Sequence, residues 1–206
     1  MIIGLTGQTG SGKSTLCEYL EEKGFYICSC DIIAKEVRSD AKTKMKIADV
    51  FGFDLINENG EIDRKKLSER AFKNKETAKK LNGIMHPEIL SRAFTYMENA
   101  LENRYEFAVL DAPLLFESGA DKKCDFTVAI IADKSERIKR ILIRDNISEK
   151  EARERMNVQY DDSFYTERAD YVIFNDSLET LRKKADCLIE TLNDYKSGVM
   201  GQSVES

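Results

Sequence analysis

The amino-acid sequence predicts an α/β fold in which a parallel β-sheet is covered by helices on both faces. Three observations support this prediction. Short apolar runs recur along the chain and alternate with segments of helical periodicity. A glycine-rich stretch stands directly between the first apolar run and the first helical segment, and a long helical block precedes the third apolar run. Strands that alternate with helices form parallel sheets, whose ligands bind beyond the carboxyl ends of the strands.

The individual elements follow from apolar runs, helical periodicity and capping residues. The strands are expected at residues 2–6, 25–29, 107–111, 126–132 and 171–174. The helices are expected at residues 13–23, 31–39, 43–51, 63–73, 75–85, 88–103, 134–145, 148–159 and 177–193. Helix ends are indicated by Gly24, by Asp63 as an N-cap, by His86-Pro87 between two helices, and by the capping box of Ser148 and Glu151. Asn59-Gly60 predicts a turn, and the tail after Tyr195 is expected to be frayed.

Composition restricts the classes of protein to consider. The chain has 206 residues, of which 42% are hydrophobic and 33% charged, which is enough for one substantial core with inserted subdomains. Its apolar runs are much shorter than the roughly 20 residues that span a bilayer. It also begins without a signal-peptide pattern, so a soluble, cytoplasmic protein is expected. The net charge of -5 disfavours extended nucleic-acid binding, although a local positive site can still hold a small anion.

Cysteine and histidine usage argues against a disulfide framework or a zinc site. The five cysteines form no CxxC pair, and an odd number without a signal peptide indicates reduced, buried thiols. The only histidine, His86, has no ligand-spaced cysteines around it. We therefore expect His86 to pack or to cap a helix.

The glycine-rich stretch GQTGSGKS, residues 7–14, has the pattern of a phosphate-binding loop. Gly7, Gly10 and Gly12 allow the backbone to form a nest of N–H groups, and the helix that follows adds the partial positive charge of its N-terminus. The pattern assigns Lys13 to the β- and γ-phosphates and the Ser14 hydroxyl to Mg²⁺. Ser11 belongs to the same loop, and Thr15 continues the helix toward the α-phosphate region. The alternative is a glycine-rich turn with an incidental lysine.

Two aspartates at strand ends complete the candidate chemistry. Asp111 ends the third strand, where a carboxylate orients Mg²⁺ directly or through water, or only caps the strand. Asp31 follows the second strand and can accept the proton of an alcohol acceptor during phosphoryl transfer. Its structural alternative is the N-cap of a helix that begins at Ile32, and the two roles are compatible.

Arg137, Arg140 and Arg144 are spaced three and four residues apart, so they share one helix face. This face is either a solvated basic stripe or part of a lid that neutralises the transferred phosphoryl group, and we favour Arg140 and Arg144 for the second role. A GTPase is disfavoured because the nearest match to N-K-x-D, at Asn74-Lys75, lacks the aspartate. A small-molecule kinase needs an acceptor pocket and a cover that excludes water, and the two helical excursions can supply both.

The placed motifs resemble the dephospho-CoA kinase family along nearly the whole chain. The matching segments are residues 3–7, 10–15 and 31–37, Leu81-Asn82 with Ile84 and His86-Pro87, residues 111–117, Arg140, Arg144-Asp145, Gln159, Ala169-Asp170 and Asn175. The phosphate loop alone is shared by many NTPases, but these segments together are specific.

The resemblance implies ATP- and Mg²⁺-dependent phosphorylation of the ribose 3′-hydroxyl of dephospho-CoA, the last step of coenzyme A biosynthesis. It implies a three-layer P-loop NTPase fold with a core of residues 1–35, 105–135 and 166–206. It also implies a helical acceptor-binding insertion at 36–104 and a helical lid at 136–165. Asp31 is then the candidate base, and Asn175 joins the loop residues in binding the nucleotide. The partner is a small molecule, neither nucleic acid nor membrane, and the oligomeric state stays open.

The chain departs from the family pattern at several positions. Ser29 replaces the first carboxylate of an acid-x-acid pair, and Lys35 stands where arginine is usual, which removes a bidentate anion contact. Gln8 stands where glycine is common and Ala112 where a larger aliphatic residue is common; both are expected to be tolerated. Two other functions stay open: another small-molecule kinase, for nucleosides or nucleotides, and a nucleotide-binding switch module without catalysis.

Overall fold

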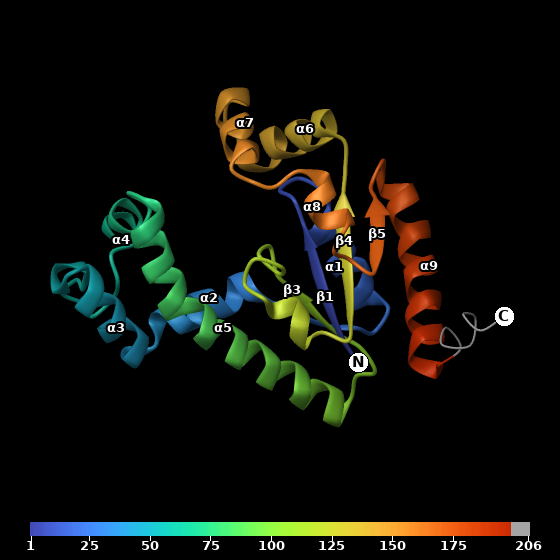
Figure 1. The fold of residues 1–206 in the computed structure, drawn as a ribbon, viewed down its shortest axis with the longest axis horizontal. Helices are drawn as coiled ribbons and strands as arrows, with labels where there is room; N and C mark the ends of the chain where they lie inside the picture. The colour runs from blue at the N-terminus through green and yellow to red at the C-terminus, as the bar shows by residue number, and fades with distance from the viewer. Residues whose placement is uncertain (199–206) are drawn as a thin grey trace. The chain divides into compact units, whose positions relative to one another are not determined.

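A computed structural model describes residues 1–198 and contains a five-stranded sheet in the order β2-β3-β1-β4-β5 (Figure 1). The strands are β1 (Ile2–Gly7), β2 (Tyr26–Ser29), β3 (Ala108–Asp111), β4 (Phe126–Ile131) and β5 (Tyr171–Phe174). β1 pairs in parallel with β3 and with β4, and β4 pairs in parallel with β5. The predicted α/β fold and all five predicted strands are therefore confirmed.

Helices α1 (Lys13–Glu22) and α9 (Leu178–Ser197) cover one face of this sheet. Alternate residues of the strands, among them Ile3, Leu5 and Val128, share one buried cluster with apolar residues of both helices. Burying such side chains contributes about 1.5 to 3 kcal/mol each. On the opposite face, Ala129 and Ile131 of β4 pack with Tyr165 of α8 (Asp162–Thr166). The sheet thus has helices on both faces, as the strand and helix order predicts.

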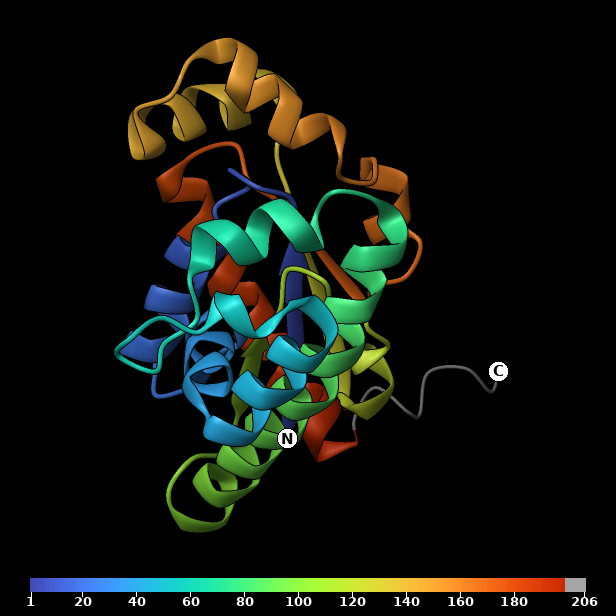
Figure 2. The ribbon, with the colours of Figure 1, turned by 90° about the vertical axis from the view of Figure 1, so that its left-hand side faces the viewer.

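Helices α6 (Lys134–Asp145) and α7 (Glu149–Asn157) follow β4 and lie side by side in both views (Figures 1 and 2). They hold each other through a small apolar cluster that includes Ile141 and Met156. The capping box predicted for α7 is present, because Ser148 accepts from the Glu151 N–H and Glu151 accepts from the Ser148 N–H. The predicted helical hairpin is confirmed.

The described part of the chain divides into two compact units, one made of Met1–Cys28 and residues 99–198, the other of Ser29–Glu98. The second unit contains α2 (Cys30–Ser39), α3 (Ala41–Phe51), the 3-10 helix η1 (Phe53–Leu55), α4 (Arg64–Ala71) and most of α5 (Lys75–Asn103). Asp63 caps α4 as predicted, accepting from the N–H groups of Lys65 and Lys66. The turn at Asn59-Gly60 is also present. The proposed borders of the insertion, 36–104, and of the lid, 136–165, stay predictions.

The predicted helix boundary at His86-Pro87 is wrong, because α5 runs through both residues. A proline inside a helix removes one backbone hydrogen bond and costs about 3 kcal/mol. Here the buried residues Met85, Ile89 and Ala93 continue at a spacing of four on both sides of Pro87. Packing along this stripe offsets the local cost, so tertiary contacts override the proline.

Smaller differences concern elements with weak sequence patterns. The short helices η1, η2 (Ala120–Lys123) and α8 were not predicted. Helix α9 extends to Ser197, beyond its predicted end, so the fraying expected after Tyr195 is wrong for residues 196–197. Residues 199–206 lie outside the described part of the chain. Within residues 1–198, no disulfide joins any of the five cysteines; Cys17 and Cys28 are buried as expected, whereas Cys30 and Cys124 are half-buried and Cys187 is exposed. In the part of the chain that the structure describes, the helices are too short or too polar to cross a membrane.

Candidate functional site

The candidate site is built on the turn between β1 and α1. Gly10 and Gly12 have φ values of 77° and 103°, which side chains disfavour. The Ser11 N–H donates to the Gln8 carbonyl over 3.1 Å and tightens the loop. The first N–H groups of α1 have no partner within the helix and open toward this turn. The loop therefore has the backbone geometry of an anion-binding nest.

Lys13, in the first turn of α1, contacts Asp111 at the end of β3 through its Nζ and the Asp111 Oδ1 atoms. The parallel register places Asp111 beside Leu5 of β1, next to the loop. Both side chains are largely buried, with 14% of Lys13 and 15% of Asp111 exposed. A pair of this kind holds its opposite charges in place until a stronger anion or cation competes for one of them.

Asn175, directly after β5, packs against the loop from the side of β1 opposite to Asp111. Its Nδ2 donates to the Ser11 carbonyl over 2.7 Å, and its own N–H donates to the Ile131 carbonyl over 2.8 Å. A Cβ atom on Gly12 would lie 2.1 Å from this Nδ2 atom. The close approach explains why glycine is required at position 12 independently of any ligand.

Two buried polar atoms beside the loop have no hydrogen-bond partner among the described residues. They are Ser11 Oγ and Asn175 Oδ1. A buried polar group without a partner costs about 1 to 3 kcal/mol, and such atoms in a loop of this geometry fit a polar ligand. Ser14, by contrast, is exposed at the start of α1, and Thr15 is half-buried.

The structure separates the predicted arginines by environment. Arg140 Nη1 donates to the carbonyls of Gly10 and Ser11 over 3.3 and 3.2 Å, and its Nη2 donates to the Asn175 carbonyl over 3.3 Å. Its guanidinium therefore lies at the loop. Arg144 is paired with Asp145 over 2.7 Å and is 58% exposed, and this arginine lowers the pKa of the Asp145 carboxyl. Arg144 is not brought to the loop in this structure.

Sequence reasoning missed the role of Arg137. This residue is not part of a solvated stripe, because it is buried and donates to Gln8, Thr9 and Gln159. Its spacing from Arg140 indicated the shared helix face. No local pattern distinguishes the buried end of that face from the exposed end.

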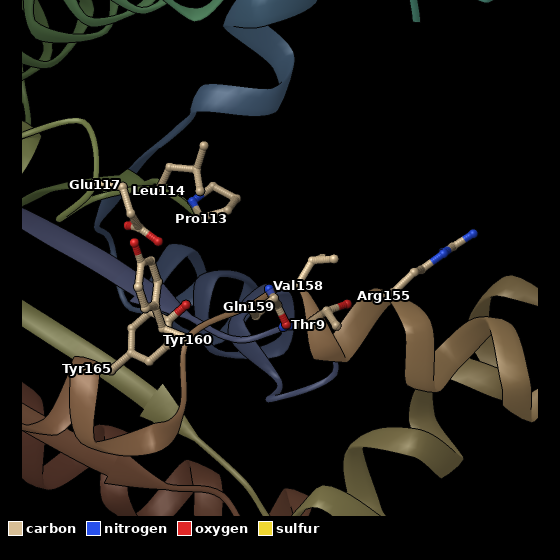
Figure 3. Close-up of a pocket in the computed structure, with 9 residues that line it drawn as sticks. All are labelled: Thr9, Pro113, Leu114, Glu117, Arg155, Val158, Gln159, Tyr160 and Tyr165. Carbon is tan, nitrogen blue, oxygen red and sulfur yellow. The ribbon is translucent and has the colours of Figure 1, made fainter. Parts of the chain in front are cut away.

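A cavity of about 430 Å³ opens beside the loop (Figure 3). Its wall includes Thr9 of the loop, Pro113 and Leu114 after β3, Val158 after α7, and Tyr160. Figure 3 shows the Arg155 side chain extending away from the other lining residues. The size and the mostly apolar wall suit part of an organic molecule next to the phosphate site.

Glu117 is the carboxylate of this cavity, and it comes from the segment 111–117 that the sequence singled out. Burial raises the pKa of Glu117. Burial and the nearby Glu117 charge raise the pKa of Tyr165, also in the wall, to about 12. Tyr160 stacks on Phe164 with ring centroids 3.9 Å apart, which fixes its ring at the cavity.

Asp31 and His86 belong to the second unit and are not among the residues that the first unit brings to the loop. Asp31 is exposed in the first turn of α2. The helix begins at Cys30 with Ser29 as its N-cap, so the alternative that Asp31 is the N-cap is wrong. His86 is half-buried within α5, where burial lowers its pKa, and it caps no helix end.

Within residues 1–198, no group of three or more His, Cys, Asp or Glu side chains is arranged to hold an ion. In phosphate-transfer sites, one or two protein ligands, the phosphates and water complete the coordination of Mg²⁺. Ser14 and Asp111 supply hard oxygen atoms of the type that Mg²⁺ prefers.

The chain is similar in sequence to one known family over most of its length. A family model described as dephospho-CoA kinase matches residues 1–180. The dephospho-CoA kinase of Fusobacterium nucleatum is 42% identical over 193 residues, which cover 93% of this chain and 98% of that protein.

Two solved structures are similar in fold. Dephospho-CoA kinase from Campylobacter jejuni has a TM-score of 0.60 at 29% identity, covering 92% of this chain and 96% of that one. A shikimate kinase from Acinetobacter baumannii, solved with shikimate, has a TM-score of 0.50 at 18% identity and covers 95% of this chain and 94% of its own. The second likeness concerns the fold alone.

Proposed function

Because the chain belongs to the dephospho-CoA kinase family, we propose that it transfers the γ-phosphoryl group of ATP to the ribose 3′-hydroxyl of dephospho-CoA. The products are coenzyme A and ADP, and the reaction is the last step of coenzyme A biosynthesis. The observation that carries this proposal is the phosphate loop, with Lys13 held against Asp111 where β1 and β3 end. The expected cytoplasmic location stays a prediction.

The loop binds the triphosphate through its backbone. The residues that we assign to this task are Gly10, Ser11, Gly12, Lys13, Ser14, Thr15 and Asn175. The contact of Lys13 with Asp111 supports a simple exchange of partners. When the β- and γ-phosphates arrive, they compete for the Lys13 ammonium and leave the Asp111 carboxylate free. The buried Ser11 hydroxyl, which has no partner among residues 1–198, supplies a further polar contact.

We assign Mg²⁺ to Ser14 and Asp111. When bound, the ion neutralises charge on the phosphate oxygens. Asp111 lies at the end of β3 and Ser14 in the first turn of α1, so both oxygens border the loop. Until the phosphates displace it, the Lys13 ammonium neutralises the negative charge of the Asp111 carboxylate.

Arg140 stabilises the transferred group. Its guanidinium is held by three carbonyls of the loop and of Asn175, so it is positioned before the substrate binds. Arginines at such sites offset the charge that develops on the phosphoryl oxygens. Arg144 lies one helical turn further along α6. For it to offset the charge on the same phosphoryl oxygens, it must first break its ion pair with Asp145.

The acceptor hydroxyl attacks the γ-phosphorus, the bond to the β–γ bridging oxygen breaks, and the hydroxyl proton moves to a carboxylate. We assign that proton to Asp31, whose exposure in α2 leaves the carboxylate open to a substrate. The cavity of about 430 Å³ beside Thr9 is assigned to part of the acceptor. Its apolar wall suits the purine or the pantetheine arm better than phosphate.

The test is incubation with Mg-ATP and dephospho-CoA, followed by mass spectrometry of the acceptor. We expect an acceptor heavier by one phosphoryl group at the 3′ position, with ADP released in equal amount. Lys13→Ala should abolish turnover. Asp31→Asn should lower kcat by roughly 100-fold or more while leaving ATP affinity within about twofold, because a general base contributes to the chemical step.

Parallel acceptors separate the other functions. Phosphorylation of a nucleoside or nucleotide but not of dephospho-CoA would indicate a different kinase. ATP binding without acceptor-dependent ADP release would indicate a switch module. Near-normal turnover of Asp31→Asn would remove the base assignment without affecting the kinase assignment.

A further inference from the structure

The phosphate loop is attached to the chain around α6 and α7 by a cluster of three polar side chains, two of them buried and one half-buried. Gln8, Arg137 and Gln159 form this cluster, which we call the Gln8–Arg137–Gln159 cluster. Arg137 is only 4% exposed and Gln8 only 3%. Buried side chains of this polarity are retained only where their hydrogen bonds are made.

Arg137 makes three hydrogen bonds with neutral oxygen atoms. Its Nε donates to the Thr9 carbonyl over 2.9 Å, its Nη1 to Gln8 Oε1 over 2.6 Å and its Nη2 to Gln159 Oε1 over 3.3 Å. Among residues 1–198, Arg137 forms no ion pair with a carboxylate; Asp162 attracts it only at longer range. Within residues 1–198, the guanidinium is therefore a buried positive charge that is compensated only by the longer-range attraction of Asp162.

The two glutamines hold the loop at positions 8 and 9. Gln8 uses both ends of its amide, because Oε1 accepts from Arg137 and Nε2 donates to the Tyr160 carbonyl over 2.8 Å. Gln159 Oε1 accepts from the Thr9 N–H over 3.0 Å. The Thr9 N–H and carbonyl are thus both held, and the residues that precede Gly10 have little freedom.

The cluster also joins the loop to both borders of the proposed lid. Arg137 lies in the first turn of α6, while Gln159 and Tyr160 follow α7. Gln159 and Tyr160 separate the cavity described above from a second, more polar one of about 540 Å³, whose wall includes Gln8 and Arg137. These contacts therefore connect the start of α6 and the segment after α7 to the loop.

A buried cation costs several kcal/mol unless an opposite charge compensates it. Under the proposed binding of ATP, the negative charge of the triphosphate would supply this compensation, because Arg137 donates to Gln8 and Thr9 of the loop that binds it. A glycine at position 8 would have no side-chain oxygen to accept the hydrogen bond that Arg137 donates to Gln8.

We propose that Arg137 is a positioning residue that supplies a buried positive charge behind the phosphate loop, and that Gln8 holds this charge and the loop in the geometry that binds triphosphate. The inference rests on the proposed binding of ATP to this loop. Its consequence is selectivity for the more highly charged nucleotide.

The experiment measures the dissociation constants of Mg-ATP and Mg-ADP by calorimetry on the full chain, at low and high salt, together with kcat, KM and the midpoint of thermal unfolding. Arg137→Gln removes the charge but keeps hydrogen-bonding groups. We expect it to weaken ATP roughly tenfold and ADP clearly less, at low and at high salt, because salt screens a buried charge much less than an exposed one. Gln8→Ala should raise the KM for ATP several-fold with a smaller change in kcat.

Two further variants separate positioning from a purely structural role. Arg137→Lys keeps the charge, so it should keep most of the preference for ATP over ADP even where the unfolding midpoint falls. Arg153→Gln is the matched control, because it removes an exposed lid arginine that is paired with Glu149. It should leave both dissociation constants unchanged.

The proposal is overturned if Arg137→Gln weakens ATP and ADP by the same factor, or lowers only the unfolding midpoint. If Arg137→Gln does not fold, the other two variants decide. The proposal is then overturned if Arg137→Lys loses as much of the preference for ATP over ADP as Gln8→Ala loses. A wild-type chain that binds ATP but does not phosphorylate dephospho-CoA refutes the proposed acceptor. The nucleotide affinities still decide this inference in that case.

Discussion

At position 12, steric space and backbone conformation both require glycine. Its φ is 103°, and a Cβ atom there would lie 2.1 Å from Asn175 Nδ2. Gly24 also has a positive φ, of 90°, but no atom lies within 4 Å of its hypothetical Cβ. Backbone strain from a side chain is expected at both positions, whereas a steric clash is expected only at Gly12. Comparing the two therefore separates these costs.

We expect Gly24→Ala to lower the free energy of unfolding by about 1 kcal/mol and to leave Mg-ATP affinity unchanged. Gly12→Ala adds a clash with Asn175 to a similar strain, so it should abolish Mg-ATP binding. Urea unfolding and calorimetry on both variants check this pair. Normal ATP binding by Gly12→Ala would mean that the loop is not the nucleotide site.

Helix α5 shows how packing at the scale of an element overrides a local preference. Pro87 lacks the N–H that would continue the helical ladder, and Gly83 costs backbone entropy one turn earlier. The buried side chains at Met85 and Ile89 nevertheless keep the helix continuous. Gly83 and Pro87 therefore lower the stability of α5 relative to alanine at the same positions.

Replacing either residue should stabilise the chain. We expect Gly83→Ala to raise the free energy of unfolding by about 0.5 to 1 kcal/mol, since no atom lies within 4 Å of the added Cβ. Pro87→Ala should raise it by more, because it restores a backbone donor. Urea unfolding checks both, and a loss of stability in Pro87→Ala would mean that its ring makes packing contacts worth more than the hydrogen bond.

At the scale of the whole molecule, ion pairs contribute to the response to acid. A hydrogen bond from Arg70 lowers the pKa of Asp54, and one from Arg144 lowers the pKa of Asp145, each from 3.8. An acid whose folded pKa lies below its unfolded pKa stabilises the folded state above the unfolded value. That contribution disappears as the pH falls through the folded pKa.

The midpoint of thermal unfolding should therefore fall as the pH drops below about 4. Because these pairs are exposed, 1 M NaCl should reduce the fall. Asp54→Asn should remove part of the pH dependence, and calorimetric scans at several pH values measure it. An unchanged acid response in this variant would show that the Asp54–Arg70 pair does not contribute to stability.

The sequence alone determined the parts of this protein that depend on local pattern. The phosphate loop, the five strands, the caps at Asp63 and Ser148 and the placement of Asp111 at a strand end all follow from residues close together in the chain. Backbone conformation, capping and periodicity act over a few residues, so a single sequence contains them.

Only the tertiary structure decided which polar side chains meet. Arg137 and Arg144 share a helix face in the sequence, yet one is buried against Gln8 and the other pairs with Asp145 in solvent. The continuity of α5 across Pro87 likewise depends on burial. Burial and hydrogen-bond partners far apart in the chain are set by how elements pack, because the free energy of a buried charge depends on all the atoms around it.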